Sequence, residues 1–195
     1  MGDQDDLKPL LTPAEYAERA GVRIRAMEPS DVDSVARIMN ERSAYANTMQ
    51  VPYTSVEYRR KMTFADMHTR FLGAVPLDAV DDAPIGNISL FRNDRPRRIH
   101  TAHIGMSIAD AWQGRGVGTV LMAVALDVAD NWWQVTRVHL EVFVDNEPGV
   151  ALYRKFGFEI EGVLRADAFR DGEYVDTYSM ARILPALERA PRVTR

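Results

Sequence analysis

The sequence predicts a single α/β (α+β) domain built on a mixed, mostly antiparallel sheet flanked by helices. The chain has 195 residues, enough for one well-packed domain and short for two. Its middle third holds three strand-like segments joined by short polar links, which favour antiparallel hairpins. An amphipathic helix then separates two further strand-like segments, so those two strands can lie parallel to each other.

The first predicted elements are a short helix and a strand. Thr12 is a capping residue, Pro13 stands at the first helical position and Glu15 lies three residues after the cap. Gly21 ends this helix. Residues 22–27 alternate apolar side chains with arginines, a pattern typical of a half-buried strand.

Two helices are expected next. Ser30 and Asp31 can cap the first one, and Glu57 stands at the capping-box position of the second, which begins after Thr54 and runs to about residue 67. The apolar face of the first helix consists of Val32, Val35, Ala36, Ile38 and Met39.

The strand-like segments of the middle third cover residues 71–77, 85–91 and 99–108. They are separated by the polar links DDAP at residues 81–84 and NDRP at residues 93–96. Such links end strands and favour turns.

The remaining elements complete the sheet. A strand is predicted over residues 138–144, a helix over residues 146–155 that ends at Gly157, and strands over residues 158–162 and 174–183. The predicted organisation is an N-terminal extension with a short helix (1–21), one domain (22–183) and a C-terminal tail (184–195), which we expect to be frayed.

Composition and charge exclude several classes of protein. A net charge of −4 and a pI near 5.6 argue against a nucleic-acid binder. The acidic start MGDQDD and the lack of a long apolar run argue against a signal peptide and a membrane span, so a cytoplasmic protein is expected. The sequence has no cysteine, and its four histidines lack the HExxH spacing, so we expect no metal site.

The stretch QGRGVG at residues 113–118 carries three glycines at alternate positions. Thr119 stands where a dinucleotide fingerprint needs glycine, and the lysine of a P-loop is missing. The stretch runs into an amphipathic helix, whose first N–H groups can bind an anion. The alternative is a turn that only connects a strand to a helix. The apolar face of the helix consists of Val117, Val120, Leu121, Val124 and Val128.

In this context the glycine stretch resembles the acetyl-CoA loop of the GNAT superfamily of N-acetyltransferases. Asn146 together with residues 151–158, ALYRKFGF, resembles the second signature of that family, and the likeness covers nearly all of residues 22–183. The resemblance implies acetyl-CoA as co-substrate, held between two central parallel strands that splay apart. The cofactor-binding residues that it implies are Met106, Ser107, Ile108, Gln113, Gly114, Arg115, Gly116, Val117, Gly118, Thr119 and Asn146.

A narrower likeness points to the bacterial L-amino acid N-acyltransferases, which acetylate the α-amine of free amino acids with a leaning toward Phe and Met. This likeness implies a free L-amino acid as the acceptor. It is carried by residues 47–52, 96–98, 130–132, 142–146 and 172–176.

Acetyl transfer to an amine needs a proton acceptor, because an ammonium has no lone pair. Glu141 is the first choice: it alternates with Val142 on the predicted strand and precedes Asn146 by five residues, like the base of some ribosomal-protein N-acetyltransferases that this segment resembles. His103 and His139 are alternatives. By the family resemblance, Tyr153 donates a proton to the departing thiolate.

The mechanism expected from the sequence is direct attack in a ternary complex, because the chain has no cysteine to carry an acyl group. Asn146 resembles a residue that bonds the pantetheine arm of coenzyme A, and it can equally cap the following helix.

The acceptor pocket is expected under residues 47–53, with Asn47 among its lining. An apolar wall is expected from Tyr45, Met49, Tyr53 and Tyr178. A substrate carboxylate can be held by Arg97, Arg98 or His100, although arginines in a turn are more often simply solvated.

Other functions stay open at this stage. The enzyme alternatives are acetylation of a protein N-terminus, as in the ribosomal-protein type, or of other small amines such as polyamines, aminoglycosides or phosphinothricin-like compounds. A non-catalytic coenzyme A-binding module is the alternative outside the enzyme class. The expected partner is a small-molecule amine, with no nucleic acid and no membrane, and family habit gives a homodimer as one option.

Overall fold

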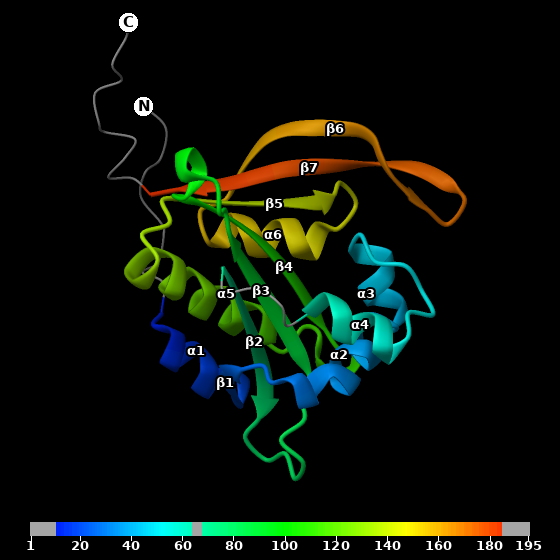
Figure 1. The fold of residues 1–195 in the computed structure, drawn as a ribbon, viewed down its shortest axis with the longest axis vertical. Coiled ribbons are helices and arrows are strands. Elements are labelled where there is room, and N and C mark those ends of the chain that lie inside the picture. The colour runs from blue at the N-terminus through cyan, green and yellow to red at the C-terminus, as the bar shows by residue number, and fades with distance from the viewer. Residues whose placement is uncertain (1–10, 64–67, 185–195) are drawn as a thin grey trace, which may run out of the picture.

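A mixed sheet forms the centre of the fold in the computed structural model, which describes residues 11–63 and 68–184 (Figure 1). Within those residues the sheet has seven strands in the order β1-β2-β3-β4-β5-β7-β6. Only β4 and β5 pair in parallel, and every other neighbouring pair is antiparallel. The strands are β1 (Val22–Ala26), β2 (Thr69–Pro76), β3 (Gly86–Arg92), β4 (Thr101–Ile108), β5 (Arg137–Phe143), β6 (Glu159–Arg170) and β7 (Glu173–Ile183).

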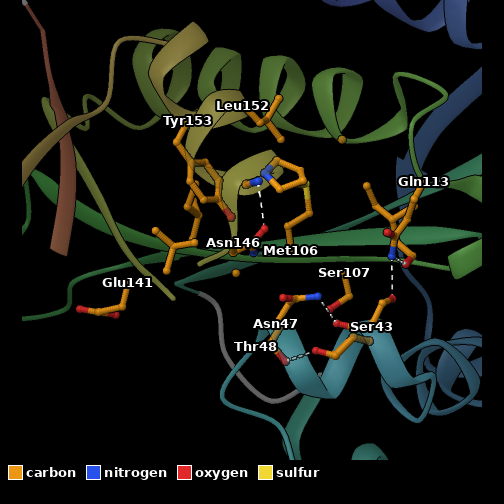
Figure 2. A pocket seen from close by; sticks show the side chains of 18 of the residues that line it. Ser43, Asn47, Thr48, Met106, Ser107, Gln113, Glu141, Asn146, Leu152 and Tyr153 are labelled. Atoms are coloured by element: carbon orange, nitrogen blue, oxygen red, sulfur yellow. Dashed lines mark hydrogen bonds between the residues drawn. The ribbon is translucent and has the colours of Figure 1, made fainter. Parts of the chain in front are cut away.

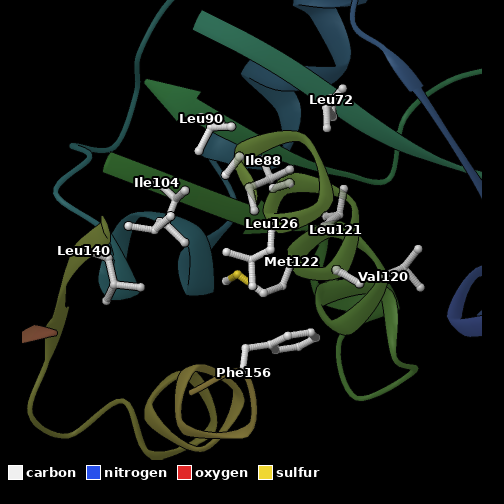
Figure 3. Packing of buried hydrophobic residues seen from close by; sticks show 14 of the residues in the cluster. Leu72, Ile88, Leu90, Ile104, Val120, Leu121, Met122, Leu126, Leu140 and Phe156 are labelled. Atoms are coloured by element: carbon white, nitrogen blue, oxygen red, sulfur yellow. The ribbon is translucent and has the colours of Figure 1, made fainter. Parts of the chain in front are cut away.

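Helices cover both faces of this sheet. Each helix packs against the side chains that the strands present on its face. Leu121 from one helix and Phe156 from the end of another are buried in one core cluster with strand residues such as Ile104 and Leu140 (Figure 3). Tyr16, from a third helix, belongs to the same cluster. On the opposite face the Ser107 hydroxyl meets the Met39 sulfur at 3.2 Å. The helices are α1 (Pro13–Ala20), α2 (Val32–Met39), α3 (Arg42–Asn47), α4 (Val56–Thr63), α5 (Val117–Asp127) and α6 (Glu147–Lys155).

The N-terminal helix α1 has the predicted capping box. Thr12 N donates to the Glu15 carboxylate at 2.8 Å, and Glu15 N donates to the Thr12 hydroxyl at 3.3 Å. Gly21 ends α1 in the left-handed conformation with φ of 64°. Because Tyr16 is buried in the main core, α1 packs with the rest of the fold, while the division at residue 21 stays a prediction.

Helix α2 starts differently from the sequence prediction. A short 3₁₀ turn over Pro29–Asp31 precedes it. The Asp31 carboxylate accepts from Arg25 at 2.6 and 2.8 Å and from Glu28 N at 2.7 Å. This carboxylate therefore ties β1 to the entrance of α2 and does not cap the helix by a side-chain bond.

The central strands confirm the predicted hairpins and crossover. Antiparallel pairs join β2 to β3 and β3 to β4, across the two polar links. The connection from β4 to β5 runs through α5, and the two strands are parallel. The predicted fold class is confirmed.

Two elements were missed or underestimated by the sequence prediction. Helix α3 is a single short helix with no apolar periodicity, and β6 runs to Arg170 where a strand ending at residue 162 was expected. Helix α4 begins as predicted and is described to Thr63; its predicted end at residue 67 lies outside the described residues, as does the predicted tail from residue 185.

The parallel pairing of β4 and β5 stops early. It covers three residue pairs, Thr101↔Arg137, Ala102↔Val138 and His103↔His139. Both strands continue and stay paired on their outer sides, β4 with β3 as far as Ile108 and β5 with β7 as far as Phe143. The two strands therefore part after His103 and His139, at a point that we call the fork.

Candidate active site

A cavity of about 650 Å³ opens at the fork (Figure 2). It is lined by α3 and the residues after it, by both strands of the fork, by the glycine loop with the first turn of α5, and by α6. Its lining residues are Ser43, Ala44, Asn47, Thr48, Met49, Gln50, His103, Ile104, Gly105, Met106, Ser107, Ile108, Gln113, Gly114, Gly116, Gly118, Thr119, Glu141, Val142, Asn146, Pro148, Gly149, Leu152 and Tyr153.

The cavity is lined from both faces of the sheet, because alternate residues of β4 point to opposite faces and residues of both kinds line it. Met106 and Ile108 pack against the core on the face covered by α5 and α6, whereas Ser107 meets α2 on the other face. We call these two parts of the cavity the α5 side and the α3 side. The α3 side is formed by Ser43, Asn47, Thr48, Met49, His103, Ser107 and Glu141.

The three glycines of the QGRGVG stretch have different physical roles. Gly114 and Gly116 have φ of 70° and 84°, the left-handed region that favours glycine. At Gly118 a Cβ would lie 3.1 Å from the Ile108 Cδ1 and 3.3 Å from the Leu152 Cδ2. The first two glycines are therefore needed to form the loop, and the third lets α5 approach β4 and α6 closely.

This geometry aims the N-terminus of α5 at the cavity. Gly116 is the N-cap, and Gly118 and Thr119 line the cavity in the first turn. The first N–H groups of a helix have no partner within it and carry the positive end of its dipole. Two other residues of the glycine stretch do not line the cavity. Val117 is buried in the core, and the Arg115 guanidinium lies over the Trp112 ring, 5.0 Å from its centre.

Side-chain bonds tie the glycine loop to α3. The Gln113 amide donates to the Ser43 hydroxyl at 2.6 Å and to the Ile108 carbonyl at 3.4 Å (Figure 2). Ser43 in turn bonds the Asp110 carboxylate, and Asp110 N donates to the Glu41 carboxylate at 2.5 Å. Ser43 was missed by sequence reasoning, because no local pattern connects it to a loop 70 residues away.

Asn146 and Tyr153 enter the cavity from α6. Asn146 caps that helix, since its side-chain oxygen accepts from Gly149 N at 3.0 Å, and its side chain also lines the cavity. Tyr153 points from α6 toward the cavity in Figure 2, with its ring 5.9 Å from that of Phe158. Burial raises the pKa of Tyr153 to about 12, so its phenol stays protonated near neutral pH.

The three proposed proton acceptors meet at the fork. His103 and Glu141 both line the cavity, with 3.2 Å between His103 Nε2 and Glu141 Oε2. His139 lies beside them but outside the cavity lining, and its ring is edge-on to that of His103 at 5.3 Å. Burial, and then the nearby charge of His103, lower the pKa of His139, which favours its neutral form.

The predicted acceptor residues are only partly brought together. Asn47 and Met49 line the cavity on the α3 side. Tyr53 is 97% exposed and does not line it. Tyr178 lies opposite Val142 in the β5–β7 pair, on the face that packs against the core, and does not line it either. Tyr45 lies next to Arg42, whose guanidinium is 5.8 Å from its ring centre.

Arg97 and Arg98 form part of an exposed 3₁₀ turn before β4, and neither lines the cavity. His100 is exposed and is likewise absent from the lining. The described residues that line the cavity include no arginine or lysine, and Glu141 is their only Asp or Glu.

No group of three or more His, Asp or Glu side chains within the described part of the chain is arranged to hold a metal ion. Likewise, none of the helices in residues 11–63 and 68–184 has the length and apolar character to cross a membrane.

Two curated relatives match most of this chain. The L-amino acid N-acetyltransferase AaaT of Escherichia coli (strain K12) is 39% identical over 161 residues, which cover 82% of this chain and 96% of that protein. The spermidine N(1)-acetyltransferase of Vibrio cholerae is 28% identical over 158 residues, which cover 80% of this chain and 90% of that protein.

Solved structures and family models agree with this relationship. The crystal structure of spermidine N-acetyltransferase from Vibrio cholerae in complex with CoA and spermine superimposes with a TM-score of 0.73, at 26% identity, covering 84% of this chain and 96% of that chain. The sequence model of the Acetyltransferase (GNAT) family matches residues 36–158. The chain therefore belongs to the GNAT acetyltransferase family and is an acetyl-CoA-dependent N-acetyltransferase.

Proposed function

We propose that this enzyme acetylates the α-amine of a free L-amino acid, by direct attack on acetyl-CoA in a ternary complex. The relative named an L-amino acid N-acetyltransferase, at 39% identity, supports this acceptor. The observation that carries the choice is the charge of the cavity, whose only lining carboxylate among the described residues is Glu141. One carboxylate suits one ammonium group, whereas a polyamine such as spermidine brings several and would favour several carboxylates.

The fork and the α5 side fit the co-substrate. Beyond His103, the edge of β4 that faces β5 has no strand partner within the described residues, so its main-chain groups are available to a ligand. The N-terminus of α5 suits the pyrophosphate. The residues that we propose hold acetyl-CoA are Met106, Ser107, Ile108, Gln113, Gly114, Gly116, Gly118, Thr119 and Asn146.

Two residues predicted from the sequence take a secondary part in this proposal. Val117 and Arg115 do not line the cavity, so they are proposed only to contribute through the N–H groups and the shape of the loop.

The α3 side would hold the amino acid. No arginine or lysine reaches this part of the cavity within the described residues, so the α-carboxylate would be bound by a neutral donor such as the Asn47 amide, which has two N–H groups and gives one to the Ser43 carbonyl. Met49, which is half exposed at this wall, would contact an apolar side chain of the substrate. This composition supports a small zwitterion over an anionic acceptor.

Proton transfer is assigned to two residues on opposite sides of the cavity. Acetyl-CoA supplies the thioester carbonyl that the amine attacks. On the α3 side, Glu141 accepts the proton that the ammonium must lose. On the α5 side, the Tyr153 phenol donates a hydrogen bond where the thiolate leaves, because its raised pKa keeps it protonated. Holding both partners in one cavity replaces a bimolecular encounter with a positioned reaction.

Release of free thiol tests this function. The protein is mixed with acetyl-CoA and, separately, with each of the twenty amino acids, with dipeptides, with peptides that carry a ribosomal-protein N-terminus, and with spermidine. We expect the highest kcat/KM with a free amino acid bearing an apolar side chain. A preference for peptides would favour the N-terminal acetyltransferase alternative, a preference for spermidine would contradict the amino acid acceptor, and cofactor binding without thiol release for any amine would favour a non-catalytic module.

Cytoplasmic location and a homodimer belong to the same proposal. The relatives named above are bacterial small-molecule acetyltransferases, which supports the first. A sedimentation measurement of the native mass would test the second.

A further inference from the structure

His103 and Glu141 occupy a special position in the sheet. His103 belongs to the last backbone pair between β4 and β5, and Glu141 is the second residue beyond the matching position on β5. Both side chains point to the α3 side, and both line the cavity where the strands part. Their side chains are 39% and 37% exposed, with 3.2 Å between Nε2 and Oε2. They form one connected unit at the apex of the fork.

This pairing matters because the two groups differ as bases. An imidazole is ordinarily about 100-fold stronger as a base than a carboxylate. A substrate ammonium gives up its proton less readily to a carboxylate alone than to a carboxylate that can pass the proton on to an imidazole. The residue better suited to keep the proton is therefore His103.

We propose that His103 is the final proton acceptor of the acetyl transfer and that Glu141 relays the proton to it. The proposal rests on the proposed function only in that the acceptor is a protonated amine; it does not depend on which amine is preferred.

The proton transfer balances without any other reactant. The ammonium N–H bond breaks, its electron pair stays on nitrogen, and an O–H bond forms on the Glu141 carboxylate. That O–H bond then breaks as Nε2 of His103 takes the proton, which requires His103 to start with its neutral proton on Nδ1. The products are a neutral amine and an imidazolium paired with a carboxylate. Because His103 is partly exposed, its proton can then leave to water.

The surroundings of His103 allow it to become charged. Glu141 is the carboxylate bonded to it, and a carboxylate stabilises an imidazolium. His139 lies edge-on at 5.3 Å, and burial lowers its pKa, which favours the neutral ring beside His103. Phe91, on the neighbouring strand, places its ring 6.2 Å from that of His103. Arg137 and Arg98 are also near this cluster, and they oppose protonation of His139.

Chemical rescue tests the proposal most directly. We expect His103→Ala to lower kcat by about 100-fold with the best amine substrate of the wild-type enzyme. Added imidazole should restore part of that loss, because it can occupy the vacated space and accept the proton. Coenzyme A should bind His103→Ala with its wild-type Kd, which shows that the variant is folded.

Two matched variants define the outcomes. His139→Ala removes the neighbouring histidine, which does not line the cavity, so any loss of kcat in this variant should not be restored by imidazole. Glu141→Gln should lose turnover without rescue, because the relay would lack its first member. If His103→Ala keeps wild-type kcat, or if its loss is not reversed by imidazole at any concentration, the proposal is overturned.

The pH profile gives a second, independent measurement. At saturating amine, kcat of the wild type should fall on the acid side, because a protonated His103 cannot accept another proton. His139→Ala should retain this acid limb and His103→Gln should lose it. An unchanged limb in His103→Gln would refute the assignment. If the wild type instead prefers a polyamine or a peptide, the proposed acceptor fails, while these measurements can still be made with that substrate.

Discussion

The two sides of the cavity are built on different principles. The α5 side consists of main-chain groups at a helix N-terminus, set in place by glycines and by tightly packed apolar residues such as Ile108 and Leu152. The α3 side consists of partly exposed polar side chains from segments far apart in the chain, held together by a few bonds such as Gln113 to Ser43. This contrast suggests a separation of tasks. The α5 side would bind acetyl-CoA, the co-substrate of the whole family, and the α3 side would select the amine acceptor.

The largest expected loss of activity comes from changing Tyr153, whose side chain reaches the cavity from the α5 side. Tyr153→Phe removes the phenol and should lower kcat by at least about 100-fold while the Kd for coenzyme A stays unchanged. Tyr178→Phe is the matched control, because that tyrosine packs against the core and does not line the cavity, and it should keep wild-type kcat. Stopped-flow or steady-state thiol release measures both variants.

The pH dependence of the wild type sharpens the same assignment. A proton donor works only while protonated, and burial raises the pKa of Tyr153 to about 12. Activity should therefore show no downward limb from Tyr153 until the pH approaches that value. A Tyr153→Phe variant with wild-type kcat would remove Tyr153 from the mechanism.

The next largest effect is expected from replacing a glycine, with different results on the α5 side and on the α3 side of the cavity. A valine at residue 118 would press against Ile108 and Leu152, and such overpacking costs about 1–3 kcal/mol. We expect Gly118→Val to weaken coenzyme A binding with a lower Tm. Gly105→Val is the comparison, because a Cβ there meets nothing within 4 Å and points to the α3 side. It should raise KM for the amine and leave the Kd for coenzyme A unchanged; the reverse pattern would contradict the separation of tasks.

The smallest expected effect concerns how α3 is held over the acceptor side. Arg170 donates to the carbonyl of Ala46 at 3.2 Å, pairs with Asp145, and lies over the Phe143 ring at 4.6 Å. Arg170→Gln should loosen this end of α3 and raise KM for the amine several-fold, with coenzyme A binding unchanged.

Arg42→Gln provides the control for Arg170→Gln. It breaks the exposed pair between Arg42 and Asp171 at 2.8 Å, which also joins α3 to the β6–β7 hairpin. Exposed ion pairs contribute little, so the kinetics should stay at wild-type values. Equal effects of the two substitutions would show that Arg170 has no special part in holding α3.

Sequence reasoning succeeded where local backbone rules decide the structure. The capping box of Thr12 and Glu15, the crossover between β4 and β5, and the alternation that sets Glu141 apart from Val142 all follow from spacing along one segment. The helix N-terminus at the glycine loop follows in the same way, because glycines and apolar periodicity lie next to each other in the chain.

It failed where the register between distant segments decides. Tyr178 faces the core because it pairs with Val142, and this register cannot be read from either strand alone. Ser43 reaches Gln113 across 70 residues without any local signal. Strand β6 was cut short because much of it is exposed and its pairing with β7 shifts twice, so the apolar alternation that marks a half-buried strand is absent.

The fork affects how firmly the two parts of the sheet are joined to each other. Within the described residues, three residue pairs join the leaf formed by β1 to β4 to the leaf formed by β5 to β7, so the backbone bonds between the two leaves lie at one end of the strands, as in a hinge. A ligand that bonds to both free edges would bridge the leaves along their open length. Since such binding favours the folded state, occupancy should raise the melting temperature of the whole sheet and not only stiffen the cavity.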